Sequence, residues 1–265
     1  MRMPTLAALT VAATALLGAT SAFAIPTSCY GGVCVPSTGT YIDNSLSFET
    51  LVTNPGDVLK GIFKATSIAD NLANITYSGY GAGGTFLAGV FDNFTLIAGS
   101  PSNQLWFTGG TLKYYTSAVD NFSVTGTAAG GIAAIQTGAL WASFDAKADN
   151  LGRTLVITLN GTPTNFTGAS TDDVFLDVNL SVPSAAGLAF DSNTMLDTNS
   201  ILRDLKFAGT ASAYNGTACS PAFPICGANT AKGFLVAVPE PVTLSLFGAG
   251  LAGAAVIRRR KAKKA

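Results

Sequence analysis

Residues 173–182 read DVFLDVNLSV, and their alternation indicates what kind of fold this chain adopts. Every second residue from Val174 to Val182 is aliphatic, whereas the residues between them are polar apart from Phe175. Successive side chains of a β-strand point to opposite faces of its sheet, so this pattern gives the strand one apolar face. The stretch therefore predicts a half-buried strand over residues 173–182.

Other segments of the chain carry similar strand signals. Residues 140–149 and 205–211 alternate in the same way, and the β-branched segment TLVITLN occupies residues 154–160. Glycine- and proline-containing turn signals stand between such segments, at residues 54–56, 81–84, 109–110 and 130–131. Only residues 184–200 and 65–73 leave room for a short helix. We therefore predict an all-β fold, an antiparallel β-sandwich or a barrel-like domain.

A short motif recurs within the strand-rich part. LKGIF at residues 59–63 returns as LAGVF at 87–91, and DNFT at 92–95 returns as DNFS at 120–123. The recurrence stops there, so it predicts successive strands of one meander rather than a repeat protein. The glycine inside each copy indicates a bulge or a close approach of two backbones.

Both ends of the chain differ from its middle. Arg2 precedes an apolar stretch at residues 6–19, and an A-x-A pattern ends at Ala24, which together indicate a signal peptide over residues 1–24. Residues 242–257 carry no charge and as a helix would span about 24 Å. A cluster of Arg and Lys follows at residues 258–264, and such a cluster holds its end of a membrane span in the cytoplasm. The β-rich domain, residues 25–237, would thus lie between an N-terminal signal helix and a C-terminal transmembrane helix.

The C-terminal segment, residues 238–265, resembles the PEP-CTERM sorting signal of exported bacterial proteins. The resemblance rests on Pro239-Glu240-Pro241, the glycine-rich apolar stretch and the basic cluster, in that order. It implies that Pro239, Glu240 and Pro241 are the recognition motif of an exosortase-type transpeptidase that removes the tail. It also implies that Arg258, Arg259 and Arg260 stop transfer through the inner membrane. The order of motifs in the β-rich part is similar to that of flocculation-associated PEP-CTERM proteins.

The charge and cysteine content of the chain limit the classes of function that it can have. Charged residues make up only 11% of the 265 residues, and the basic residues gather at the C-terminal end. The remaining domain is acidic, which argues against nucleic-acid binding because phosphate contacts need Lys and Arg. The four cysteines, Cys29, Cys34, Cys219 and Cys226, are expected to form disulfides in an oxidising compartment. We favour the two local bridges, although a bridge between the two ends of the domain is the alternative.

The absence of histidine excludes Ser-His-Asp, Cys-His and histidine-ligated metal sites. Two routes to chemistry remain. The first is a carboxylate pair as in glycoside hydrolysis, from Asp145 with Asp149, or from Asp172 with Asp173 or Asp177. The second is an oxygen-ligand calcium site built from Asp172, Asp173 and Asp177. Because aspartates at turns and on exposed strand faces are common, we expect neither, and we predict no cofactor and no enzyme activity.

Aromatic residues in glycine-rich segments offer a binding surface instead. Tyr77 and Tyr80 are expected to be exposed and to stack on sugar rings, whereas Trp106 and Trp141 are expected to be at least partly buried. We therefore expect a non-catalytic cell-surface or matrix protein, with signal peptidase and exosortase as partners during export. Exopolysaccharide, in a biofilm or floc, is the expected partner afterwards. An exported carboxylate-dependent enzyme acting on that polysaccharide is the alternative.

Overall fold

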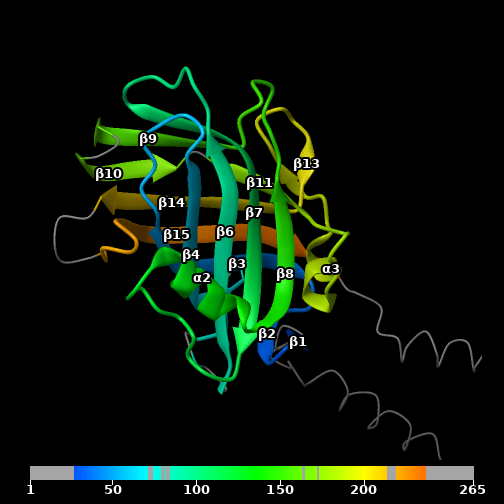
Figure 1. Ribbon diagram of the computed structural model, residues 1–265. Helices are drawn as coiled ribbons and strands as arrows, with labels where there is room; N and C mark the ends of the chain where they lie inside the picture. Colours follow the sequence, from blue (N-terminus) through cyan, green and yellow to red (C-terminus); the bar gives the residue numbers. More distant parts are fainter. Residues whose placement is uncertain are drawn as a thin grey trace, which may run out of the picture.

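A computed structural model describes residues 27–70, 74–78, 81, 84–162, 165–171, 173–213 and 219–236 (Figure 1). The signal peptide and the sorting segment predicted above lie outside these ranges. The described part consists mostly of strands, and two short helices pack against them. The all-β prediction is confirmed.

Eight antiparallel strands close into a barrel. Their order around it is β3 (Gly39–Glu49), β4 (Val58–Ala69), β6 (Phe86–Leu96), β7 (Gln104–Ser117), β8 (Ala139–Ala146), β11 (Val174–Val178), β14 (Leu205–Ala213) and β15 (Ile225–Leu235), which returns to β3. Of the two architectures predicted, the structure is the barrel, because β8 pairs with both β7 and β11 and leaves no open edge there.

The barrel wall divides along part of its length. Strand β7 pairs with β8 over residues 111–116 and with β9 (Leu155–Thr162) over residues 104–107. Strand β14 likewise pairs with β11 at one end and with β10 (Asn165–Thr171) at the other. Since β9 also pairs with β10, the wall between β7 and β14 consists of β8 and β11 in one half and of β9 and β10 in the other.

Small hairpins complete the structure. Strands β1 (Thr27–Tyr30) and β2 (Val33–Pro36) form one, and β12 (Met195–Leu196) with β13 (Leu202–Arg203) forms another. The short strand β5 (Ile75–Tyr77) pairs with β4. Figure 1 shows β1, β2 and helix α3 (Ala185–Phe190) toward the lower end of the molecule and the β12–β13 hairpin toward the upper end.

The stretch that predicts the fold forms a shorter strand than its alternation suggests. Strand β11 ends at Val178, and Asn179 then closes a turn, because its side chain accepts a hydrogen bond from the Ser181 N–H and its carbonyl accepts one from the Val182 N–H. Leu180 is 59% exposed and Val182 42% exposed. The strand prediction is confirmed for residues 174–178 and is wrong for residues 179–182.

Two glycine pairs predicted as turns lie inside elements. Gly109 and Gly110 have φ angles of 71° and 116° within β7, opposite Asn93 of β6, whose φ is 65°. The β6–β7 pairing skips Asn93 and Gly110, so this is an irregularity within two paired strands rather than a turn. Residues 130–131 lie in helix α2 (Ala128–Gln136), and Ala65–Ala69, considered for a helix, belong to β4. The short helix expected within residues 184–200 is confirmed as α3.

Two features stabilise helix α2: Thr127 caps its N-terminus, and its apolar side packs against the outer surface of the barrel. The Thr127 hydroxyl accepts a hydrogen bond from the Gly130 N–H at 3.1 Å. Ile132 and Ile135 then pack with Ile62 and Val90 on the outside of the barrel. The helix therefore covers the outer faces of β4 and β6, and both faces of this part of the sheet are buried.

The recurring motif forms neighbouring strands, as predicted. Strands β4 and β6 are antiparallel, and their register places Gly61 opposite Phe91 and Phe63 opposite Gly89. Each phenylalanine ring lies over the facing glycine, so the close approach expected of these glycines is confirmed. The second copy of the DNFT motif differs, because residues 120–123 form a loop before α2 and no strand.

One strand places polar side chains inside the barrel. The buried face of β3 is an uninterrupted polar row, defined here by residues Tyr41, Asp43, Ser45, Ser47 and Glu49, each 0–7% exposed. The outward face contains three apolar residues, Ile42, Leu46 and Phe48, together with Asn44; Leu46 is 41% exposed and Phe48 packs with Phe122. The interior of this barrel is thus apolar on most strands and polar along β3.

Candidate functional site

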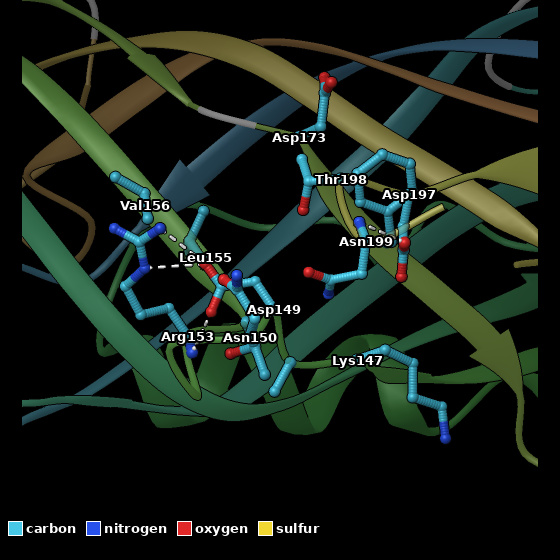
Figure 2. Close-up of a pocket in the computed structure, with 13 residues that line it drawn as sticks. Lys147, Asp149, Asn150, Arg153, Leu155, Val156, Asp173, Asp197, Thr198 and Asn199 are labelled. Carbon is cyan, nitrogen blue, oxygen red and sulfur yellow. Dashed lines mark hydrogen bonds and ion pairs between the residues drawn. The ribbon is translucent and has the colours of Figure 1, made fainter. Parts of the chain in front are cut away.

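A polar pocket of about 330 Å³ opens where the barrel wall divides (Figure 2). The loop between β8 and β9, the start of β9, strand β11 and the β12–β13 hairpin form its walls. Its lining combines charged side chains, uncharged hydrogen-bonding side chains and one aromatic ring: Lys147, Asp149, Asn150, Arg153, Leu155, Val156, Asp173, Phe175, Asp197, Thr198 and Asn199, with Ala148 and Thr154.

One wall is a tight turn held by Asp149. Its carboxylate accepts hydrogen bonds from the backbone N–H groups of Leu151 and Arg153. The same carboxylate binds the Arg153 guanidinium through two nitrogens, at 2.8 and 2.6 Å. Burial alone would raise the pKa of Asp149, but these hydrogen bonds together lower it below its ordinary value. Asp149 is therefore ionised and committed to the turn.

The opposite wall contains a second ion-pair network. Asp197 accepts hydrogen bonds from the backbone N–H groups of Asn199 and Ile201, and it pairs with Arg203 Nε at 2.9 Å. Arg203 also reaches Asp177 at 3.1 Å, and Lys147 lies 3.7 Å from that carboxylate. Burial would raise the pKa of Asp197, but its hydrogen bonds and Arg203 hold it below the ordinary value.

Aromatic rings flank these charges. Lys206 forms an ion pair with Asp173, and its ammonium lies 5.9 Å from the centroid of Phe175, which lines the pocket. On the other side the Arg153 guanidinium stacks 5.0 Å from the ring centroid of Trp106. Each carboxylate that lines the pocket, Asp149, Asp173 or Asp197, thus has a cationic partner, and the pocket wall is close to neutral.

Uncharged polar groups are left to face the opening. Figure 2 shows Asn150, Thr198 and Asn199 around the pocket, and within the described part of the chain no hydrogen bond involves their side chains. An amide offers both donors and an acceptor, and a hydroxyl offers one donor and two acceptor sites. The pocket thus presents uncharged groups that can donate and accept hydrogen bonds, with the largely buried Phe175 in its wall.

Within the described residues, the carboxylates proposed as a catalytic pair or a calcium site each have another partner. Asp145 accepts a hydrogen bond from Asn179, whereas Asp149 belongs to the turn described above. Asp173 is exposed and paired with Lys206, and Asp177 is paired with Arg203. Asp172 lies outside the described residues. Over the ranges that the structure describes, no group of three or more acidic or cysteine side chains is placed to hold a metal ion.

The expected exposure of Tyr77 is wrong. Tyr77 is 4% exposed, belongs to the main core and donates a hydrogen bond to the Thr85 carbonyl. Tyr80 lies outside the described residues. The tryptophans agree with expectation, because Trp141 is 3% exposed and Trp106 is half-buried beside Arg153. The sugar-stacking surface predicted at residues 77–80 is therefore not formed by Tyr77.

Both local disulfides predicted from the sequence are present. Cys29 and Cys34 bridge the β1–β2 hairpin, where they are directly opposite in the register. Cys219 and Cys226 join the start of β15 to the segment before it. Neither bridge lies at the polar pocket.

A second, smaller cavity of about 40 Å³ lies inside the barrel. Glu49 and Asn229 line it together with apolar side chains such as Phe91, Phe94 and Leu112. Asn229 is 5% exposed, and its Nδ2 has no hydrogen-bond partner within the described structure. The cavity has room for ordered water, which would satisfy this amide, but not for a sugar residue.

Sequence reasoning missed the residues that shape the polar pocket: Asn150, Arg153, Thr198 and Asn199. A usable signal existed, because Asp149 and Asp197 each precede residues typical of turns, in DNLGR and DTNS. That signal identifies loops, but only the tertiary structure brings the two loops to one opening.

Comparison with known proteins identifies the C-terminal segment. The family model for the PEP-CTERM protein-sorting motif matches residues 237–261. Comparison with curated proteins gave no match, and comparison with solved structures gave none. Across the residues that the structure describes, no helix is long and apolar enough to cross a membrane. The predicted transmembrane helix, residues 242–257, and the motif itself lie outside that part.

Proposed function

Starting from a chain that carries a PEP-CTERM sorting motif, and is therefore exported and sorted by an exosortase, we propose that its barrel is a non-catalytic exopolysaccharide-binding module. In this proposal the polar pocket at the division of the barrel wall holds neutral sugar residues of a biofilm or floc matrix. The observation that carries the proposal is the pairing of every carboxylate lining the pocket with a cation, which leaves uncharged amide and hydroxyl groups to meet the ligand.

The electrostatics of the pocket support binding rather than hydrolysis. A glycosidase needs a carboxylic acid whose pKa is raised, next to a second carboxylate. The pocket has the reverse arrangement, because hydrogen bonds and Arg partners lower the pKa of Asp149 and Asp197. The carboxyls with a strongly raised pKa, Asp43 and Glu49, are 0% and 7% exposed inside the barrel, away from any polymer.

Binding to exopolysaccharide purified from the producing bacterium tests the proposal directly. Asn199→Ala removes an amide at the pocket but keeps the backbone N–H that Asp197 binds. Because one hydrogen bond contributes about 0.5–1.5 kcal/mol, affinity measured by isothermal titration calorimetry should fall about twofold to thirteenfold. Asn103→Ala, at an exposed asparagine outside the pocket, is the matched control. Equal affinity of both variants and the original protein would remove the pocket from the proposal.

The alternative, a carboxylate-dependent enzyme, predicts a different result. Chain length of the polysaccharide after incubation with the protein should stay constant if the protein only binds. Shortening that is abolished by Asp145→Asn, Asp172→Asn or Asp177→Asn would support the enzyme instead. In the native host, deletion of the gene should reduce cell aggregation while polysaccharide is still made.

A further inference from the structure

One end of the barrel carries an uncharged segment with exposed apolar side chains. Residues 178–190, VNLSVPSAAGLAF, contain no charged side chain. Within them Leu180, Val182 and Leu188 are 59%, 42% and 39% exposed. Phe234, near the end of β15, is 39% exposed. Together these four residues are called the α3 surface here. Contiguous exposed apolar residues on a protein mark a surface that contacts another protein or a membrane.

The described chain ends beside this surface. The Val236 N–H donates a hydrogen bond to the Ala189 carbonyl of α3 at 2.9 Å. The last described residue therefore lies next to the helix that carries Leu188. Whatever follows Val236 in the sequence must leave the domain from this end.

The distance from Val236 to the membrane is short while the sorting tail is in place. Only residues 237–241 separate Val236 from the apolar stretch that begins at Val242. Six Cα-to-Cα steps span at most about 20 Å when fully extended. The headgroup layer of one leaflet takes up about 6 Å of that length. The end of the barrel next to Val236 cannot be far from the lipid.

We propose that the α3 surface rests on the outer face of the lipid bilayer while the tail anchors the protein. Burying Leu180, Val182, Leu188 and Phe234 among lipid headgroups removes apolar area from water, which is favourable in proportion to that area. Since residues 178–190 have no charge, this segment brings no ionised side chain into the contact. The contact depends on the sorting tail, because the tail keeps the α3 surface close to the membrane.

This orientation turns the polar pocket away from the membrane. The Ser184 hydroxyl, at the start of α3, binds the Trp141 carbonyl near the beginning of β8, whereas Lys147 lines the pocket just beyond the end of β8. Six residues of strand separate the two positions by about 20 Å. Before the tail is removed, the pocket would already face outward.

Tryptophan fluorescence with brominated lipids tests the contact in the full-length protein. The protein is reconstituted in phosphatidylcholine–phosphatidylglycerol vesicles, some of which carry brominated acyl chains that quench nearby indoles. Leu188→Trp introduces the probe at the α3 surface, and Val182→Trp repeats it at a second position. Leu151→Trp is the matched control, because Leu151 is 65% exposed on the loop at the pocket end. The signal of native Trp106 and Trp141 is subtracted with the unsubstituted protein.

The added emission of Leu188→Trp and Val182→Trp should lose most of its intensity to brominated lipid, while that of Leu151→Trp should keep it. Two outcomes would overturn the proposal. If acrylamide in the water quenches the probes at 182 and 188 as strongly as the one at 151, the surface faces solvent. If neither acrylamide nor brominated lipid quenches them, another protein molecule covers the surface instead.

Discussion

At the scale of single residues, two glycines decide how β4 and β6 meet. A Cβ atom at Gly89 would lie 2.0 Å from the Phe63 ring and 2.7 Å from the Lys113 carbonyl oxygen. A Cβ atom at Gly61 would lie 2.2 Å from the Phe91 ring. The two phenylalanines therefore occupy the space that the glycines leave. The motif L-x-G-x-F recurs because each of the two strands supplies one glycine and one phenylalanine to this packing.

Gly89→Ala should destabilise the fold by about 1–3 kcal/mol, because an overpacked core must displace a ring and a backbone. Phe63→Leu replaces the ring that a Cβ atom at position 89 would contact with a smaller side chain. In the double variant the cost of the alanine should therefore be smaller than in the single variant, which urea unfolding of all four proteins of the cycle measures. If the two substitutions change the free energy of unfolding by strictly additive amounts, Phe63 is not the residue that excludes a Cβ atom at position 89.

At the scale of secondary-structure elements, the polar row of β3 places two carboxyl groups in the barrel interior. Burial raises the pKa of Asp43 to about 7, against the opposing effect of the hydrogen bond from the Tyr114 hydroxyl. Burial also raises the pKa of Glu49 to about 7, although the Ser47 hydroxyl binds its carboxylate. Both carboxyls hold protons in the folded chain at pH values where the unfolded chain has lost them.

Stability should therefore rise as the pH falls from about 8 to about 5. An acid whose pKa is raised on folding stabilises the fold fully below its unfolded pKa, and this contribution is lost as the pH rises through the folded pKa. Each group contributes a slope of at most about 1.4 kcal/mol per pH unit in this window. Urea unfolding across the window measures it.

Asp43→Asn and Glu49→Gln remove the titrating groups while keeping side chains of the same shape. Each variant should show a flatter dependence of stability on pH, and the double variant the flattest. A slope that persists unchanged in the double variant would assign the effect to other groups and would contradict the burial argument.

At the scale of the whole molecule, the sorting tail determines where the barrel works. The PEP-CTERM match at residues 237–261 makes the chain an exported protein that is anchored to the membrane for a time. The short connection between Val236 and the apolar stretch ties that anchor to the α3 end of the barrel. The division of the wall into β8–β11 and β9–β10 opens the polar pocket at the other end.

Glu240→Ala should leave the protein uncut in the membrane fraction, because it removes the central residue of the motif that the transpeptidase recognises. Mass spectrometry of the recovered protein should show loss of the C-terminal segment in the original sequence and its retention in the variant. Thr243→Ser, just beyond the motif, is the control and should be processed normally. Release of the Glu240→Ala protein at the normal mass would show that Glu240 is dispensable.

Local sequence patterns were sufficient to predict the strand content and the sorting of the protein, and they favoured the cysteine pairing that the structure contains. These depend on local chemistry: alternation along one strand, sequence separation within one loop, and a linear motif read by another protein. Local signals also located β9, β14 and α3. They failed at Gly109–Gly110 and at residues 130–131, where glycine is needed inside an element rather than between two elements.

Which face of each strand lies inside the barrel, and which loops meet, depends on long-range packing that no local pattern contains. Phe48 of β3 lies outside the barrel, where it packs against the cluster formed with α2 and the preceding loop, whereas Asp43 lies inside, where Tyr114 reaches it from across the barrel at 2.9 Å. The pocket joins Asp149 and Asp197, which are far apart in the sequence, because barrel closure brings their loops together. Alternation in the sequence indicates that the two faces of a strand differ in polarity, whereas long-range packing determines which of the two faces is buried.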